Sequence, residues 1–531
     1  MNLAPTLPDT EAPLDAPRSA VLAETTWLVA LSLLSPAAGL AVEMALAWRF
    51  GTSAVVDAYR VAVLLVLFGQ QLFVTSILPF VIVPVLAEYH AQGKMAEAWA
   101  SIDAMARLLL VFGCLIASAL FVSADPATSF LAPGLHGEGR ATAVFFVRWC
   151  GLAFVPLCWS GVACGILYAH GAFRVAPVAQ LASNMIVLVA IVALGKRLGA
   201  NGVVIGVVLG AIASAGIYVV SLSRVRREFA PKGRAIAIDG RALGKFARLA
   251  GPLLAGIVVG QASGAVVTRA LSRLAAGSLA AFGYSWKLGQ VVLLAPGALS
   301  TVLFPKFSAS WHSNARGDFT ASSVRALRAI LFVTLPATCI SFALRDPLVK
   351  LLLERGAFSA TAGRTTAALF GMLILGAPGN AMTTYIDRLF YATQETSIPV
   401  FVDIGSSLLP LLIVPALALR LGVLGVAAAY MLLPWLTAGV LMALFQSRHK
   451  HAGFPLGELR GFFLRTTILA VVSAWLGTRL PAICGTSSAV TCLAGTVSAA
   501  GLFLFAARAA GVPEAVQCGA RFARLVRSYK G

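Results

Sequence analysis

Charged residues are scarce in this chain. Only 12% of its 531 residues are Asp, Glu, Lys or Arg, whereas 59% are hydrophobic. Soluble domains carry about a quarter charged residues, so this composition excludes a soluble globular protein and predicts a polytopic membrane protein. The formal net charge of +20 fits the Lys and Arg that gather in cytoplasmic loops of membrane proteins, and we therefore expect no nucleic-acid partner.

Motifs for catalysis and metal binding are also missing from the sequence. There is no Gly-rich phosphate loop and no nucleophile elbow, so we expect neither an ATPase nor any other enzyme. The six histidines and eight cysteines show no metal-ligand spacing, and no cofactor is expected. Cys484 and Cys492 bracket the stretch CGTSSAVTC near the C-terminus. Two interpretations stay open for this pair: a disulfide in an oxidising compartment, or two unconnected cysteines at helix ends.

Long apolar runs dominate what is present. A helix needs about 20 apolar residues to cross the hydrocarbon core of a bilayer, and about 14 such windows occur along the chain. The runs are continuous, whereas strands of a membrane barrel would alternate over about ten residues. The sequence therefore predicts an all-α polytopic membrane protein with about 14 transmembrane helices.

Parts of the chain repeat at a nearly constant distance. The stretch FYATQETSIPV at 390–400 echoes LYAHGAFRVAPV at 167–178, and LLERGAFSA around Gly356 echoes LAPGLHGEG around Gly134. Both separations are about 222 residues, which indicates an internal duplication. Each copy holds six spans, an even number, so both copies have the same orientation. We expect two homologous six-helix bundles around a central cavity, plus two C-terminal helices.

The predicted organisation follows from these spans and from the basic loops. The loop between the two bundles is the most basic in the chain, which places it and both termini in the cytoplasm. The predicted parts are 1–25, a disordered cytoplasmic tail; 26–222, the first bundle; 223–246, a basic cytoplasmic linker; 247–446, the second bundle; 447–510, two additional transmembrane helices; and 511–531, a basic cytoplasmic tail.

Four motifs resemble those of the MurJ/MviN family of lipid II flippases. They are FGTSAVVDAYRVAVLL at 50–65, VPVLAEYHAQGK at 83–94, LLERGAFSATAGRTTAAL at 352–369 and FYATQETSIPV at 390–400. The family belongs to the superfamily of multidrug, oligosaccharidyl-lipid and polysaccharide exporters. The resemblance covers roughly residues 26–446. It implies a bacterial inner-membrane protein that moves an undecaprenyl-linked saccharide, lipid II or an exopolysaccharide precursor, to the outer leaflet by alternating access.

The chain departs from the family at the anion site of the central cavity. The family lines this cavity with arginines that suit the pyrophosphate of lipid II. Val42 and Pro36 stand at two arginine positions of the first span, and Gln70 and Gln71 replace an arginine pair of the second. A family cation is retained as Lys287. Much of the family's anion site is thus lost. Two interpretations stay open: the substrate is not lipid II, or the phosphate contacts of lipid II lie elsewhere in this chain.

Charged side chains within membrane spans are costly and usually face a cavity or a partner. Asp57 and Arg60, three residues apart on one helical face, also fit a structural pair. Arg148 also fits a cation that extends to the membrane surface, and Arg388 fits a cytoplasmic anchor. The candidates for substrate-binding or cavity residues are Lys287, Glu43, Asp57, Arg60, Arg148, Arg269, Gln70, Gln71 and Arg388.

Three functions remain open at this point. The first is a flippase for a lipid-linked saccharide, acting as a monomer with membrane lipid around it. The second is a cation-coupled exporter of small amphipathic drugs, in which Glu43 binds a coupling ion instead of neutralising an arginine. The third is a non-transporting scaffold that recruits envelope enzymes through its basic loop and tail. The sequence identifies no coupling ion.

Overall fold

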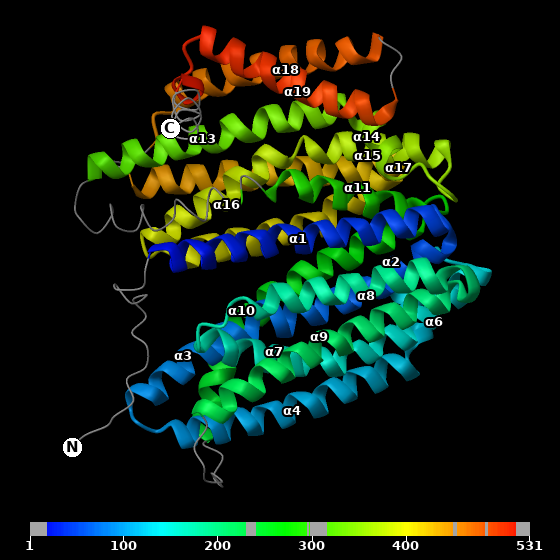
Figure 1. Ribbon diagram of the computed structural model, residues 1–531, viewed down its shortest axis with the longest axis vertical. Helices are drawn as coiled ribbons and strands as arrows, with labels where there is room; N and C mark the ends of the chain where they lie inside the picture. Colours follow the sequence, from blue (N-terminus) through cyan, green and yellow to red (C-terminus); the bar gives the residue numbers. More distant parts are fainter. Residues whose placement is uncertain are drawn as a thin grey trace.

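The chain is helical throughout the part that the structure describes. The computed structural model describes residues 18–229, 240–294, 297, 316–449, 454–483 and 487–516, and no strand occurs among them (Figure 1). Ten helices in these residues are long and apolar enough to cross a membrane. The predicted all-α membrane fold is therefore confirmed, while the number of 14 spans stays a prediction.

The first eleven elements form what we call the first unit. They are α1 (Arg18–Phe50), α2 (Ala54–Gly69), the π-helix η1 (Gln70–Ile77), α3 (Leu78–Ala91), α4 (Met95–Val122), α5 (Ala124–Leu131), α6 (Gly137–Cys150), the 3₁₀ turn η2 (Gly151–Ala153), α7 (Phe154–Ala169), α8 (Val175–Leu198) and α9 (Ala200–Phe229). Because α2, η1 and α3 follow one another without a break, the π-helix lies in the middle of one long helical segment. Such π-helical turns are often found at functional sites.

The second unit comprises α10 to α17, and two further helices follow it. Their bounds are α10 (Gly240–Ser272), α11 (Ser278–Val292), α13 (Arg316–Ala343), α14 (Arg345–Leu352), α15 (Ala360–Ile374), α16 (Ala377–Ala392), α17 (Ser397–Arg448), α18 (Leu456–Ile483) and α19 (Ser488–Ala509). The backbone of α17 leaves helical geometry at Gly422, with φ 61° and ψ −140°. A straight helix of 52 residues would measure about 78 Å, far more than a bilayer, so α17 holds two helical passes that meet at this glycine.

The same succession of helices occurs in both units. The opening helices α1 and α10 are each 33 residues long, α4 and α13 are each 28, and the short helices α5 and α14 are each eight. A duplicated chain would produce this pattern of order and length. The predicted domain boundaries themselves stay a prediction.

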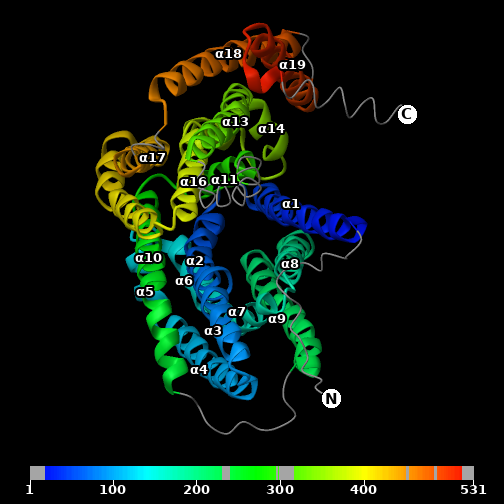
Figure 2. The same cartoon turned by 90° about the vertical axis from the view of Figure 1, so that its left-hand side faces the viewer.

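The opening helix of each unit lies where the two units meet. Helix α1 packs on α8 of its own unit and on α11 of the other, and α10 packs on α17 of its own unit and on α2 of the other. Helices α18 and α19 pack against α13 and α14, on the side of the second unit away from the first (Figures 1 and 2). The two units are thus joined through α1, α2 and α11 and through α10, which also packs on η1, α3, α4 and α5 of the first unit.

Each unit has an apolar core of its own, and a third core joins them. Phe154 belongs to the core of the first unit and Phe390 to that of the second. The joining core includes Leu46 and Phe146 of the first unit together with Tyr284 of the second, all of them fully buried. Burial of this apolar area stabilises the contact between the units.

Candidate functional site

The two units touch through four turns at one end of the molecule. The backbone N–H of Ala357 donates to the carbonyl oxygen of Trp48 at 2.9 Å. The hydroxyl of Tyr284 donates to the carbonyl oxygen of Gly51 at 2.8 Å. The backbone N–H of Gly134 meets the hydroxyl of Ser272 at 3.4 Å. We call this end, formed by the α1–α2, α5–α6, α10–α11 and α14–α15 turns, the closed end.

The echoed glycines Gly134 and Gly356 make reciprocal contacts at the closed end. A Cβ atom on Gly134 would lie 2.0 Å from the carbonyl oxygen of Ser272, at the end of α10. A Cβ atom on Gly356, whose φ is +62°, would lie 2.3 Å from the carbonyl oxygen of Trp48, near the end of α1. The α5–α6 turn of the first unit thus contacts α10, the opening helix of the second unit. The α14–α15 turn of the second unit contacts α1, the opening helix of the first. Only glycine permits such approaches.

We expect Gly134→Ala to weaken the closed end. Because the added methyl group would overlap a backbone oxygen, the free energy of unfolding should fall by about 1–3 kcal/mol. Gly139→Ala is the matched control, since its Cβ would lie at an ordinary 3.5 Å from Ala54. Denaturant titration of the protein in detergent micelles, followed by tryptophan fluorescence, measures both variants. Equal stability of the two variants would contradict the close contact.

Asp57 joins the units by capping a helix of the other unit. Its two carboxylate oxygens accept hydrogen bonds from the backbone N–H groups of Gly277 at 2.6 Å and Ala280 at 2.8 Å. Gly277 precedes α11 with φ 86° and has no side chain that could cap the helix. A carboxylate from α2 therefore satisfies donors that the N-terminus of α11 leaves free, and its negative charge suits that helix end. Asp57 is only 3% exposed.

Glu43 and Arg60 form a buried ion pair within the first unit. Nη1 of Arg60 donates to Oε1 of Glu43 at 2.9 Å, and the side chains are 14% and 11% exposed for Arg60 and Glu43 respectively. The guanidinium also lies over the ring of Tyr284, 5.1 Å from its centroid. Gly283 leaves room for this arginine, because a Cβ there would lie 2.3 Å from Nε. The arginine charge is therefore neutralised at the surface of α11.

Lys287 lies well inside α11, away from the closed end. It is nine residues beyond the N-terminus of α11 at Ser278, a rise of about 14 Å, near half the thickness of a hydrocarbon core. Its half-buried side chain reaches α1, since a Cβ on Gly39 would lie 2.9 Å from Nζ of Lys287. The same point is 3.7 Å from Nδ2 of Asn184 on α8. The ammonium group thus lies between the units, next to an amide.

A line of amide side chains runs from this point through the first unit. Nε2 of Gln70 donates to Oε1 of Gln180, whose own Nε2 donates to Oδ1 of Asn184 at 3.3 Å. Nδ2 of Asn184 donates to the carbonyl oxygen of Ser35 at 3.2 Å. We call Gln70, Gln180 and Asn184 the amide line. Gln70 begins the π-helix η1, so the non-standard turn of the backbone coincides with one end of the line.

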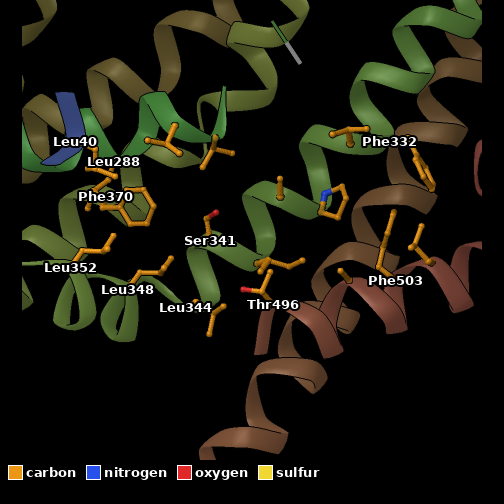
Figure 3. A pocket seen from close by; sticks show the side chains of 18 residues that line it. Leu40, Leu288, Phe332, Ser341, Leu344, Leu348, Leu352, Phe370, Thr496 and Phe503 are labelled. Carbon is orange, nitrogen blue, oxygen red and sulfur yellow. The ribbon is translucent and has the colours of Figure 1, made fainter. Parts of the chain in front are cut away.

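An apolar pocket of about 580 Å³ adjoins Lys287 on the side of the second unit. Its walls come from α1, α11, α13, α14, α15 and α19 (Figure 3). Leu40 and Leu288, which directly follow Gly39 and Lys287 in the chain, both line it. The labelled residues in Figure 3 are Leu40, Leu288, Phe332, Ser341, Leu344, Leu348, Leu352, Phe370, Thr496 and Phe503. An apolar pocket and a polar site therefore meet across α1 and α11.

Comparison with known proteins identifies the family. A family model described as Lipid II flippase MurJ matches residues 46–494, which is most of the chain. The chain belongs to the lipid II flippase MurJ family. A Burkholderia cenocepacia protein named Lipid II flippase MurJ is 25% identical over 386 residues, or 70% of this chain and 74% of that protein. A Treponema pallidum protein named Probable lipid II flippase MurJ is 22% identical, over 77% of this chain and 79% of that protein.

Solved structures show the same fold. The structure of "Lipid II flippase MurJ, inward closed conformation" has a TM-score of 0.75 at 19% identity, and the match covers 91% of this chain and 99% of that chain. An inward-facing multidrug resistance MATE family transporter of the MOP superfamily has a TM-score of 0.67 at 13% identity, with 79% and 95% covered. The identification as a multi-pass membrane protein of the MurJ family, made from four motifs, is therefore confirmed.

The remaining candidates for the MurJ-type cavity lie away from Lys287. Nε of Arg148 on α6 donates to the carbonyl oxygen of Phe121, at 3.2 Å. Arg269 donates to the carbonyl oxygen of Phe130 at the closed end, where it helps to hold α10 against α5. Arg388 lies near the end of α16, on the side of the membrane away from the closed end. Gln71 follows Gln70 but is exposed.

Sequence reasoning missed two members of the amide line and left the cysteine pair open. Gln180 and Asn184 lie four residues apart in the apolar run of α8, a helical spacing that could have signalled a shared polar face. Cys492 is buried in α19, while Cys484 lies outside the described residues, so their disulfide stays a prediction.

Proposed function

We propose that this MurJ-family protein is a flippase that moves an undecaprenyl-linked saccharide from the inner to the outer leaflet of the bacterial inner membrane. One observation carries this proposal: an apolar pocket of about 580 Å³ adjoins a lysine and a line of amides across α1 and α11. A lipid-linked saccharide has two corresponding parts: a long apolar chain that suits the pocket, and an anionic, hydroxylated head group that suits the lysine and the amides. The names of the curated relatives favour a precursor of peptidoglycan, and thus a role in cell-wall synthesis.

Alternating access would take place at the closed end. We place this end on the outer side, because the basic loops place the termini in the cytoplasm. In the present conformation the polar site would then be closed toward the outer side. Rocking of the two units would separate Asp57 from α11 and Gly51 from Tyr284, which opens the site outward. No covalent step is involved, so the protein would act as a transporter and not as an enzyme.

The state of Glu43 argues against the cation-coupled drug exporter. That function would use an acidic group in the first unit that is free to bind an ion or a proton. Here the carboxylate of Glu43 is engaged by Arg60 and largely buried. Asp57, the other acidic candidate of the first unit, is engaged by two backbone N–H groups. Both carboxylates therefore favour structural roles over ion coupling.

Transport in proteoliposomes tests the proposal. We expect the full-length protein to move at least one of two fluorescent lipids, either lipid II or a saccharide linked to undecaprenyl by a single phosphate. Lys287→Ala should lower the rate at least about tenfold, since a hydrogen bond to a charged group contributes about 1.5–3 kcal/mol. Arg148→Ala, which removes a cation on α6 that contacts the end of α4, should stay within about twofold.

Three outcomes would decide the matter. Movement that depends on Lys287 supports a flippase with its head-group site on α11. Failure to move either lipid, by protein that is folded and inserted, would contradict the flippase and favour the scaffold. Movement that Lys287→Ala leaves unchanged would place the head-group site elsewhere.

A further inference from the structure

The polar site between the units carries little net positive charge. From Leu34 to the end of α1, from Leu254 to the end of α10, and along α2, α8 and α11, the described basic residues are Arg49, Arg60, Lys196, Arg197, Arg269 and Lys287. Arg49, Lys196, Arg197 and Arg269 lie in the last turns of their helices, toward the closed end. Arg60 is neutralised by Glu43. Among these described cations, Lys287 alone combines a place well inside its helix, away from the closed end, with a charge that no paired carboxylate cancels.

The single uncompensated positive charge of Lys287 matches one phosphate group better than two. A saccharide linked to a lipid through a pyrophosphate carries two negative charges at that linkage, and one linked through a single phosphate carries one. A charge that is taken from water and left without a counter-charge is costly in a low-dielectric site. Lysine also binds phosphate as a point charge, whereas an arginine pair could hold two phosphate groups in a bidentate manner.

The amide line has the hydrogen-bonding character of a saccharide site. Each carboxamide offers two N–H donors and a carbonyl with two lone pairs. The bonds from Gln70 to Gln180, from Gln180 to Asn184 and from Asn184 to Ser35 use one N–H of each amide. A second N–H and a second lone pair therefore remain on each carboxamide. Sugar hydroxyls both donate and accept, as amides do, while phosphate oxygens of a diester only accept.

From these observations we infer that the site selects a saccharide joined to its lipid through a single phosphate, with Lys287 on the phosphate and the amide line on the sugar. This inference rests on the proposed flippase function. It departs from the relatives' names in the class of head group, because lipid II has a pyrophosphate. It assigns specificity to Gln180 and Asn184 as well as to Lys287. Gln70 then favours the smaller charge because an amide at this position leaves the site without a second cation.

Competition binding tests the inference. We would place the full-length protein in lipid nanodiscs and compare, by native mass spectrometry, one sugar linked to undecaprenyl through a single phosphate with the same sugar linked through a pyrophosphate. The wild-type protein should bind the monophosphate at least as tightly as the pyrophosphate. The variant Gln70→Arg should gain at least about tenfold for the pyrophosphate, the gain expected from one added charge-assisted contact, and less than about threefold for the monophosphate.

A second variant separates sugar recognition from phosphate recognition and does not add charge. Gln180→Leu should weaken binding of a glycosylated undecaprenyl phosphate about fivefold or more, since about 1 kcal/mol is lost per hydrogen bond, and leave bare undecaprenyl phosphate unchanged. The matched control is Val189→Ala, which shortens an exposed side chain of the same helix, α8, and should leave binding of both lipids unchanged.

The results distinguish the inference from the function on which it rests. Tenfold tighter binding of pyrophosphate by the wild-type protein would overturn the inference and leave the flippase standing. An equal effect of Gln180→Leu on glycosylated and bare lipid would overturn the role of the amide line. Absence of binding for both lipids would overturn the proposed function itself.

Discussion

Asp57→Ala is expected to open the closed end. The substitution leaves the N–H groups of Gly277 and Ala280 buried without an acceptor and removes a negative charge from the N-terminus of α11. Two unsatisfied buried donors cost about 1–3 kcal/mol each, so the balance between closed and open conformations should shift at least about tenfold toward the open one. The transport rate should fall as well, because without the carboxylate of Asp57 the closed end would no longer seal the polar site.

Cysteine labelling measures this shift. Thr52→Cys, in a background without the native cysteines, places a thiol beside Gly277 at the closed end. Its reaction with a membrane-impermeant maleimide should accelerate at least about tenfold when Asp57→Ala is added. The matched control is Asp125→Ala, which removes another carboxylate of the same end, from an ion pair with Arg140 that is 44% and 57% exposed. Equal labelling rates for the two variants would contradict the capping role.

Arg60→Ala is expected to destabilise the protein strongly. The carboxylate of Glu43 would remain buried without its partner, and removal of one member of a buried ion pair costs about 3–5 kcal/mol. The double variant Glu43→Gln/Arg60→Met removes both charges and fills most of the same volume. It should recover most of the loss, because no uncompensated charge remains.

The unfolding free energy in detergent micelles distinguishes these variants. Arg226→Ala is the control, since its ion pair with Asp103 is 48% and 40% exposed and such pairs contribute about 0–1 kcal/mol. If the double variant were as unstable as Arg60→Ala, the loss would come from packing against Tyr284 and Gly283 and not from an isolated carboxylate.

The fold class could be predicted from composition and repetition alone. Continuous apolar runs predict helices, because a bilayer offers no other partner to the backbone of a single segment. The echo of Gly134 in Gly356 was informative because each glycine meets the same steric demand at the end of the opposite opening helix. Because a Cβ atom cannot fit at either contact, both copies of the repeat keep glycine there while the neighbouring side chains differ.

The partners of the charged residues could not be predicted in the same way. Asp57 and Arg60 lie on one face of α2, which suggested a pair, yet their partners are α11 and Glu43. One side of a helix can contact several neighbouring helices, and the sequence does not show which of them a given side chain will contact. For the same reason the sequence did not predict that Lys287 faces α1 and α8, or that Arg148 lies against the end of α4.

The reciprocal contacts of Gly134 and Gly356 have the form of an isologous interface, the kind that two identical subunits make around a two-fold axis. In a homodimer every substitution appears on both sides of that axis. Within one polypeptide each side varies alone. By the correspondence of Tyr59 with Tyr284, the first unit has Ala62 where the second has Lys287. On the proposal made above, a symmetric frame would therefore hold its cargo by one asymmetric charge, and the second unit alone would supply it within the described residues.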